Sequence, residues 1–165
     1  MLTYCPQRAI KMRKTEEDYI TTDSFPTDAL SWLMATCSKL LRERLSFEFA
    51  NAGYKVTPEQ WAILAHLWQQ DGLSQQSLAD RFHRSKVAAF QIIGKLEKQG
   101  LVIRRPDPVD GRSKRIFLTP EGRKIQSILV PLAKKNISQA IDGISEKDLE
   151  TAKSVIRKVI RNTKR

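Results

Sequence analysis

The sequence predicts a mainly α-helical fold that carries one small β-hairpin. Three observations predict this fold class: apolar residues recur every three or four positions in several segments, helix-capping residues precede those segments, and only two short runs, 101–103 and 115–118, look like strands. With 165 residues, 41% of them hydrophobic, the chain is long enough for one domain, or one domain plus an oligomerisation arm.

The first helix is predicted over residues 27–52, after an N-terminal extension, residues 1–26, that shows little periodicity. Thr27 is its expected N-cap and Gly53 its expected end. One face is apolar, and its members are Leu30, Leu33, Met34, Cys37, Leu40, Leu41 and Leu45. Because free cysteine is among the most buried residue types, Cys37 is predicted to be a buried core thiol.

The second helix is predicted to begin at Thr57 and to end near Gln70. Thr57 is the expected cap, Pro58 occupies the first turn, and Gln60 completes a capping box. Trp61 and Trp68 lie on one face, and tryptophans at this spacing are more often core residues than ligand contacts.

Two short helices and a hairpin follow. Ser74 is the expected cap of a helix to about Phe82, residues 81–84 form a turn, and Ser85 caps a helix to about Gln99. The hairpin then has a long polar tip, residues 106–114. Helix, turn, helix and projecting hairpin together predict a winged helix-turn-helix lobe over residues 55–122.

The C-terminal part, residues 123–165, is predicted to be helical. Thr119-Pro120 repeats the cap-then-proline start, and Pro131 should kink or break the helix near Leu129 because proline lacks a backbone donor. Ser145 opens a last helix with a narrow apolar seam, which should require a partner. Residues 27–52 and 123–165 are therefore predicted to be dimerisation helices that complete a domain over residues 27–165.

Charge is concentrated over the predicted lobe. The net charge is +11, and residues 80–124 hold 12 basic and 5 acidic side chains. Such a basic patch is the electrostatic footprint of nucleic-acid binding. Two cysteines and two histidines without ligand spacing predict no metal, no cofactor and no enzyme activity. No transmembrane helix or signal peptide is expected, which predicts a cytoplasmic protein.

The helix from Ser85 should enter the major groove of double-stranded DNA. Gln91 suits adenine, while Val87 and Phe90 suit a thymine methyl. Arg112 at the tip of the hairpin suits the minor groove, with Asp110 to orient it. The predicted DNA-binding residues are Ser74, Gln75, Arg84, Ser85, Lys86, Val87, Phe90, Gln91, Asp110, Arg112 and Lys114.

The chain resembles MarR-type winged-helix transcription regulators from about Thr57 to Gly122. The resemblance rests on 58-PEQW-61, 73-LSQ-75 followed by Leu78-Ala79, 96-LEK-98 before 100-GLV-102, Asp110 with Arg112, and Leu118-Thr119 followed by Gly122. It implies a homodimer with interleaved terminal helices, usually a repressor, often released from DNA by a small aromatic effector or by oxidation.

The effector cleft that the resemblance implies should here be lined by Trp61, His66 and Trp68, near the Pro131 kink. The chain departs from the family pattern at Ala88, Phe90 and Gln91, which alters the expected operator sequence, and at Gly111, which replaces a common arginine. Cys37 lies about one turn too late to correspond to the reactive cysteine of the peroxide-sensing branch.

Two other functions are compatible with the same elements. A winged-helix module for protein–protein contact would need an uncharged or acidic face, which the basic lobe disfavours. A sequence-neutral nucleic-acid-binding module fits the charge but leaves Gln91 and Phe90 without a role.

Overall fold

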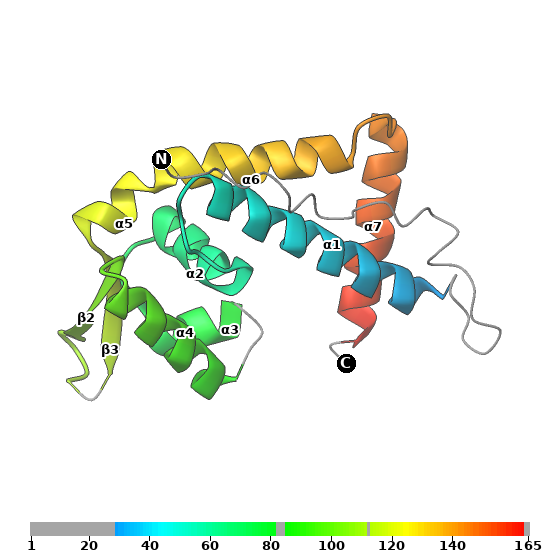
Figure 1. Cartoon of the computed structure of the whole chain (residues 1–165). Helices are drawn as coiled ribbons and strands as arrows, with labels where there is room; N and C mark the ends of the chain where they lie inside the picture. Colours follow the sequence, from blue (N-terminus) through cyan, green and yellow to red (C-terminus); the bar gives the residue numbers. More distant parts are fainter. Residues whose placement is uncertain (1–28, 82–84, 112, 164–165) are drawn as a thin grey trace, which may run out of the picture. The chain divides into compact units, whose positions relative to one another are not determined.

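The computed structural model describes residues 29–81, 85–111 and 113–163, and the chain divides into two units, residues 1–40 and 41–165. The helices are α1 (Leu30–Asn51), α2 (Pro58–Gln69), α3 (Gln75–Arg81), α4 (Lys86–Lys98), α5 (Pro120–Lys124), α6 (Gln126–Ala140) and α7 (Glu146–Thr163). The strands are β1 (Leu73–Ser74), β2 (Val102–Pro106) and β3 (Lys114–Leu118). The mainly helical fold with a small hairpin is confirmed (Figure 1).

The three strands form one antiparallel sheet in the order β1-β3-β2. β2 and β3 pair from Val102 opposite Leu118 to Pro106 opposite Lys114, which gives the hairpin a fixed register. β1 was not predicted from the sequence. It has only two residues and pairs Leu73 with Ile116, so its extended conformation depends on a distant partner strand.

Predicted helix caps are confirmed at the starts of α2, α4 and α5, and also at α3 and α7. Thr57 and Gln60 form a reciprocal capping box at α2, and Ser85 and Thr119 accept hydrogen bonds from the third residue of α4 and α5. Gln60 also connects α2 to the end of α4, because its Nε2 donates to Gln99 Oε1 over 2.9 Å. The caps therefore define where these helices begin, and Gln60 also links α2 to α4.

The hydrophobic core within residues 41–165 contains side chains from α1, α2, α3, α4 and α6 and from all three strands. Its largest fully buried side chains are Phe49, Ile63, Leu64, Leu67, Leu78, Ile93, Leu96, Ile116, Ile125, Leu129 and Val102. The ring centroids of Phe49 and Trp61 lie 5.4 Å apart with an interplanar angle of 52°, and those of Trp61 and Trp68 lie 5.3 Å apart with an angle of 63°. The two tryptophans are half-buried, so they cover the core without being enclosed by it.

The predicted break near Leu129 is wrong. Helix α6 continues through Pro131, and the interruption lies at Ile125, between α5 and α6. The position of the break follows from packing. Gly122 lies so close to the Leu101 carbonyl that a Cβ there would be 2.0 Å from the oxygen, which fixes α5 against the sheet, and Ile125 is buried directly after it.

Cys37 is exposed, so the prediction of a buried thiol is wrong. Leu30, Leu33 and Leu40 on the same stripe are 49%, 48% and 40% exposed, and burial along α1 begins only at Leu45. The spacing correctly predicted an amphipathic helix. It could not predict how much of the stripe the same chain covers.

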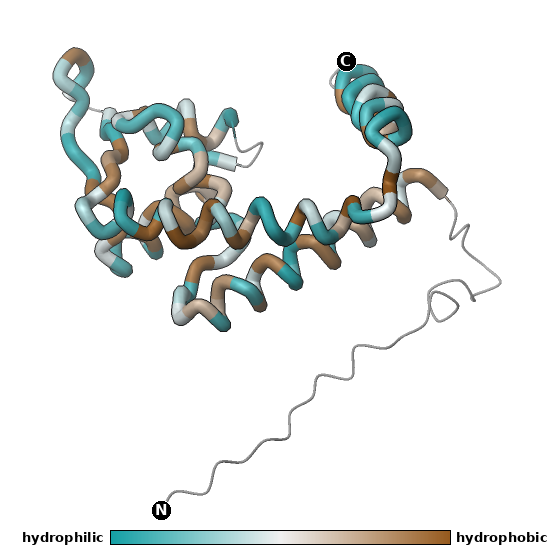
Figure 2. The backbone as a smooth tube through the Cα atoms, turned by 90° about the horizontal axis from the view of Figure 1, so that it is seen from above, coloured by the Kyte–Doolittle hydropathy of each residue, from teal (hydrophilic) through white to brown (hydrophobic). Residues whose placement is uncertain are grey.

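Helix α7 has no buried residue. Its apolar positions recur along an otherwise polar helix, as Figure 2 shows for the helix that ends at the C-terminus. Val155, Ile156 and Ile160 are 47%, 38% and 44% exposed. Ser145 begins the helix as predicted, because its Oγ accepts from the Asp148 amide at 3.1 Å.

Candidate nucleic-acid interface

Helix α4 presents a mixed polar and apolar face to solvent. Ala89, Ile93 and Leu96 are buried on its inner side, so the positions between them must point outward. The outward side chains include Lys86, Val87, Phe90 and Gln91, all exposed, with Val87 at 67% and Phe90 at 54%. Two large apolar groups are costly to leave in water, which marks this face as a contact surface.

Helix α3 lies beside α4 and begins at a second capping serine. Ser74 Oγ accepts from the Ser77 amide at 3.1 Å, and Leu78 and Ala79 are buried beneath the helix. At its start Gln75 is partly exposed and Gln76 is exposed. The start of α3 therefore supplies polar side chains and amide groups, which suit phosphate oxygens.

The tip of the hairpin is organised by Asp107, which the sequence interpretation missed. Its Oδ1 accepts from the amides of Val109 at 2.9 Å and Asp110 at 3.3 Å, and its Oδ2 accepts from Arg115 Nε at 2.6 Å. These hydrogen bonds and the nearby guanidinium lower the pKa of Asp107, so the carboxylate stays charged. The Asp-Pro pair at 107–108 was the available signal, since aspartate before proline favours a turn.

A groove of about 460 Å³ brings α3, α4 and the hairpin together. Four predicted DNA-binding residues line it: Ser74, Gln75, Phe90 and Lys114. Three further lining residues were not predicted: Gln76, Arg104 and Ser113. Arg104 could have been found from strand alternation, because it lies two residues after the buried Val102 but carries a charge.

The remaining predicted residues are distributed around this groove or lie outside the described ranges. Ser85, Lys86, Val87 and Gln91 are exposed on α4 or at its start without lining the groove, and Asp110 lies in the hairpin loop. Arg84 and Arg112 lie outside the described residues. The DNA contacts predicted for both, including the minor-groove contact of Arg112, therefore stay predictions.

Part of the positive charge of the lobe is neutralised by ion pairs within the fold. Three arginines pair with acids: Arg104 with Glu97, Arg115 with Asp107 and Arg123 with Asp71. Lys86 and Lys114, in contrast, form no ion pair with any residue that the structure describes. Their ammonium groups are available to an external anion.

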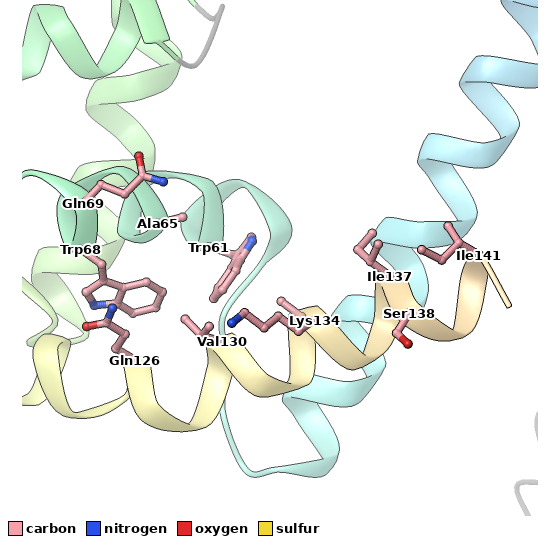
Figure 3. Close-up of a pocket in the computed structure, with 11 residues that line it drawn as sticks. Trp61, Ala65, Trp68, Gln69, Gln126, Val130, Lys134, Ile137, Ser138 and Ile141 are labelled. Carbon is pink, nitrogen blue, oxygen red and sulfur yellow. The ribbon is translucent and has the colours of Figure 1, made fainter. Parts of the chain in front are cut away.

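A second cavity, a cleft of about 670 Å³, lies between α2 and α6. Figure 3 shows the side chains of Trp61, Trp68 and Lys134 pointing into the same space. Trp68 is anchored there, because its Nε1 donates to the Gly122 carbonyl at 2.8 Å. The full lining is Trp61, Ala65, Trp68, Gln69, Gln126, Val130, Ala133, Lys134, Ile137, Ser138 and Ile141.

His66 and Pro131, which were predicted beside this cleft, are not among its lining residues. His66 is half-buried elsewhere on α2, and burial, followed by the proximity of Arg81, lowers its pKa. Lys134 was not predicted, and it adds the one positive charge to a wall that is mostly aromatic and aliphatic, with Gln69, Gln126 and Ser138 as its other polar residues.

Across residues 29–81, 85–111 and 113–163, no group of three His, Cys, Asp or Glu side chains is arranged to hold a metal ion. None of the helices in these ranges combines the length and the apolar character needed to cross a bilayer.

Comparison with known proteins shows the same architecture. The MarR family model matches residues 56–114. The transcriptional regulator YybA of Bacillus subtilis is 26% identical over 110 residues, covering 67% of this chain and 73% of its own. The S. aureus MepR–DNA complex is 25% identical with a TM-score of 0.74, covering 81% of this chain and 97% of its own.

A further structure, CouR from Rhodococcus jostii bound to p-coumaroyl-CoA, is 19% identical with a TM-score of 0.70 and covers 81% of this chain and 92% of its own. At that identity it shows the fold alone. YybA and a further relative, HosA of Escherichia coli, which is 26% identical over 105 residues, are both named as transcriptional regulators. The family match, the named relatives and the winged fold together show that the chain is similar to MarR-type transcriptional regulators over its winged helix-turn-helix lobe.

Proposed function

We propose that this protein is a homodimeric repressor that binds a near-palindromic operator in double-stranded DNA. The observation that carries the proposal is the exposed face of α4, where Lys86, Val87, Phe90 and Gln91 lie next to the groove and the hairpin. A major groove about 12 Å wide accepts such a helix, and charged, amide and apolar groups can each distinguish base edges. The complex of its relative MepR with DNA supports the same binding mode.

Within this proposal the predicted residues have separate roles. Gln91 pairs with a base, Val87 and Phe90 contact thymine methyls, and Lys86 and Lys114 contact phosphates. Ser74, Gln75, Arg84 and Ser85 position the lobe on the backbone. Arg112, oriented by Asp110, enters the minor groove.

The proposed domain organisation places the DNA-binding lobe over residues 55–122 and the dimerisation helices over 27–52 and 123–165, after an extension of residues 1–26. The exposed seam of α7 supports this division, since it has no cover within the described part of the chain. In a dimer the two α4 helices should lie about 34 Å apart, one turn of DNA. A role on DNA is also consistent with the predicted cytoplasmic location.

The test is selection from a random 30-base-pair duplex library, followed by affinity measurements against the selected and a scrambled duplex. A sequence-specific repressor should enrich a near-palindrome, and its affinity should fall with salt by about 0.9 log units per phosphate neutralised. Strong binding without enrichment would favour the sequence-neutral module, and absence of binding would favour the protein-interaction module.

We further propose that the cleft between α2 and α6 binds a small aromatic anion. Its aromatic and aliphatic walls, with one ammonium group from Lys134, match a ring that carries a carboxylate. Such a ligand can release DNA only if it binds more tightly to a dimer whose α4 helices no longer match the operator.

Calorimetry and gel shifts with benzoate-like compounds test this cleft. Lys134→Gln should weaken binding, because it removes the positive charge, whereas Lys135→Gln is a control on the same helix that does not line the cleft. If no compound binds or alters operator affinity, the sensor proposal fails, while the DNA-binding proposal is unaffected.

A further inference from the structure

Arg104 connects the hairpin to the middle of α4. It lies on β2, forms an ion pair with Glu97 of α4, and donates from Nη2 to the Phe90 carbonyl at 3.2 Å. Its amide also donates to Glu97 Oε1 at 3.3 Å. The guanidinium lies against α4 at Gly94, where a Cβ would be 3.7 Å from Nη2. One side chain therefore contacts α4 at three positions along nearly two turns.

The same guanidinium lies over the Phe90 ring, with its central carbon 4.7 Å from the ring centroid. The Arg104 side chain is only 14% exposed, whereas Phe90 is 54% exposed. A planar cation over an aromatic face is attracted by the ring and also limits its rotation. An exposed phenylalanine on the DNA-facing side of α4 is thereby held in one orientation by a largely buried partner.

The environment of Arg104 is unsuited to a phosphate contact. Glu97 neutralises its charge, and its Nε is buried without a hydrogen-bond partner among the described residues. An arginine that is already paired with a carboxylate neutralises little phosphate charge, so it displaces few counterions from the DNA. It therefore adds little to the affinity for DNA of any sequence. Its stacking and its hydrogen bond to Phe90 remain as the interactions through which it can act.

We propose that Arg104 is a positioning residue that holds the Phe90 ring in the base-reading surface, and that it determines sequence discrimination rather than general affinity for DNA. The inference rests on the proposed sequence-specific binding. If so, a residue of β2 contributes to the DNA-sequence specificity, although it lies outside α4, the helix that contacts the bases.

The matched variants are Arg104→Lys and Arg105→Lys. Arg105 is the next residue of β2 and stacks on Phe117 with 5.4 Å to the centroid, so its substitution removes a comparable cation–ring contact away from α4. Both variants keep their charge. Affinities are measured by fluorescence anisotropy for the duplex that the wild type selects and for its scrambled version, and thermal melting shows whether each variant is folded.

Arg104→Lys should lower the ratio of specific to scrambled affinity by about tenfold, since stacking and hydrogen-bond geometry are lost together. Arg105→Lys should leave the ratio within about twofold of wild type. In the Phe90→Leu background, Arg104→Lys should cause little further loss, because both substitutions remove the same contact.

A second variant separates positioning from phosphate contact. The double substitution Glu97→Gln with Arg104→Gln removes one charge of each sign and tests the proposal even if Arg104→Lys does not fold. The ratio should fall as in Arg104→Lys while the salt slope stays unchanged; a phosphate contact would lower the slope by about 0.9.

An unchanged ratio in the folded Arg104 variants, an equal loss in Arg105→Lys, or a reduced salt slope would each overturn the inference. If the wild type itself enriches no sequence, the proposed function fails first, and that outcome is visible before any variant is compared.

Discussion

Arg115 Nε donates to Asp107 Oδ2 at 2.6 Å, and this ion pair closes the base of the hairpin loop. The other oxygen of Asp107 receives two loop amides, so one carboxylate, only 8% exposed, determines the path of residues 107–110. The loop that carries the predicted minor-groove residues is therefore pre-shaped by a side chain that faces inward. Pre-shaping lowers the ordering cost of binding.

Asp107→Ala should reduce affinity for the selected duplex by about tenfold, because the loop must then be ordered when DNA binds. Thermal stability should decrease modestly, because Arg115 and the two loop amides lose their shared acceptor. Trypsin should cleave the loop faster in the variant. Asp107→Asn retains an oxygen that can accept hydrogen bonds from the loop amides. Its affinity and cleavage rate should lie between those of the wild type and Asp107→Ala. Unchanged affinity and cleavage in Asp107→Ala would contradict this role.

Gln91→Ala should lower discrimination at one base pair of each half-site. A bidentate amide–adenine contact contributes about 1–3 kcal/mol of discrimination, whereas non-specific affinity depends on phosphate contacts that the substitution leaves intact. The measurement compares affinities for the selected duplex, its single-base variants and a scrambled duplex. If specific and scrambled affinities fall together, Gln91 contacts phosphate or supports the fold.

His66 should make the protein less stable in mild acid. Burial and the charge of Arg81 lower its pKa in the folded state below the ordinary value of 6.5. The unfolded chain therefore binds a proton more readily, and stability should decrease as the pH falls below about 6.5 towards the folded-state pKa. Thermal melting between pH 5 and 8 measures this dependence. His66→Gln should flatten it, and an unchanged slope would exclude His66 as its source.

Features set by neighbouring residues were predictable from the sequence. The caps Thr57, Ser85 and Thr119 bond amides three residues away, so spacing alone identified them. Val87, Phe90 and Gln91, which were predicted to contact bases, are exposed on α4. Strand β1 was missed because it depends on a partner more than forty residues later in the sequence, at Ile116.

Side chains that act between elements were also missed. In the sequence, Asp107 and Arg104 look like ordinary charged residues of a loop and a strand. Only the folded chain shows that Asp107 contacts Arg115 and that Arg104 contacts Glu97 and Phe90. The exposure of Cys37 and the break at Ile125 depend on which surfaces the folded chain covers. A periodic pattern predicts which face of a helix is apolar, but it does not predict which other element packs against that face.

Ile156→Lys should dissociate the dimer and abolish tight operator binding. The apolar seam of α7 is exposed in the single chain, and a charge within a buried dimer contact would be unpaired. Light scattering at micromolar concentration should shift from twice 18.9 kDa to 18.9 kDa. Ser154→Lys places the same charge on the opposite, polar side of α7 and should remain dimeric. A wild-type protein that is monomeric in this measurement would contradict the dimer proposal.

Gly122→Ala should destabilise the folded protein by about 1–3 kcal/mol. A Cβ at this position would lie 2.0 Å from the Leu101 carbonyl oxygen, which is backbone and cannot rotate away. The shift needed to relieve that contact would also strain the bond from Trp68 Nε1 to the Gly122 carbonyl. The higher helix propensity of alanine, about 1 kcal/mol, offsets only part of the loss.

The matched control for Gly122→Ala is Gly111→Ala in the hairpin loop, where an added Cβ meets no described atom within 4 Å. It should change the free energy of unfolding by less than about 0.5 kcal/mol. Urea denaturation followed by tryptophan fluorescence measures both variants, because Trp61 and Trp68 pack against the core. Equal stability of the two variants would mean that α5 can move away from the sheet at little cost. The bend at Ile125 would then need another cause than the close contact between Gly122 and Leu101.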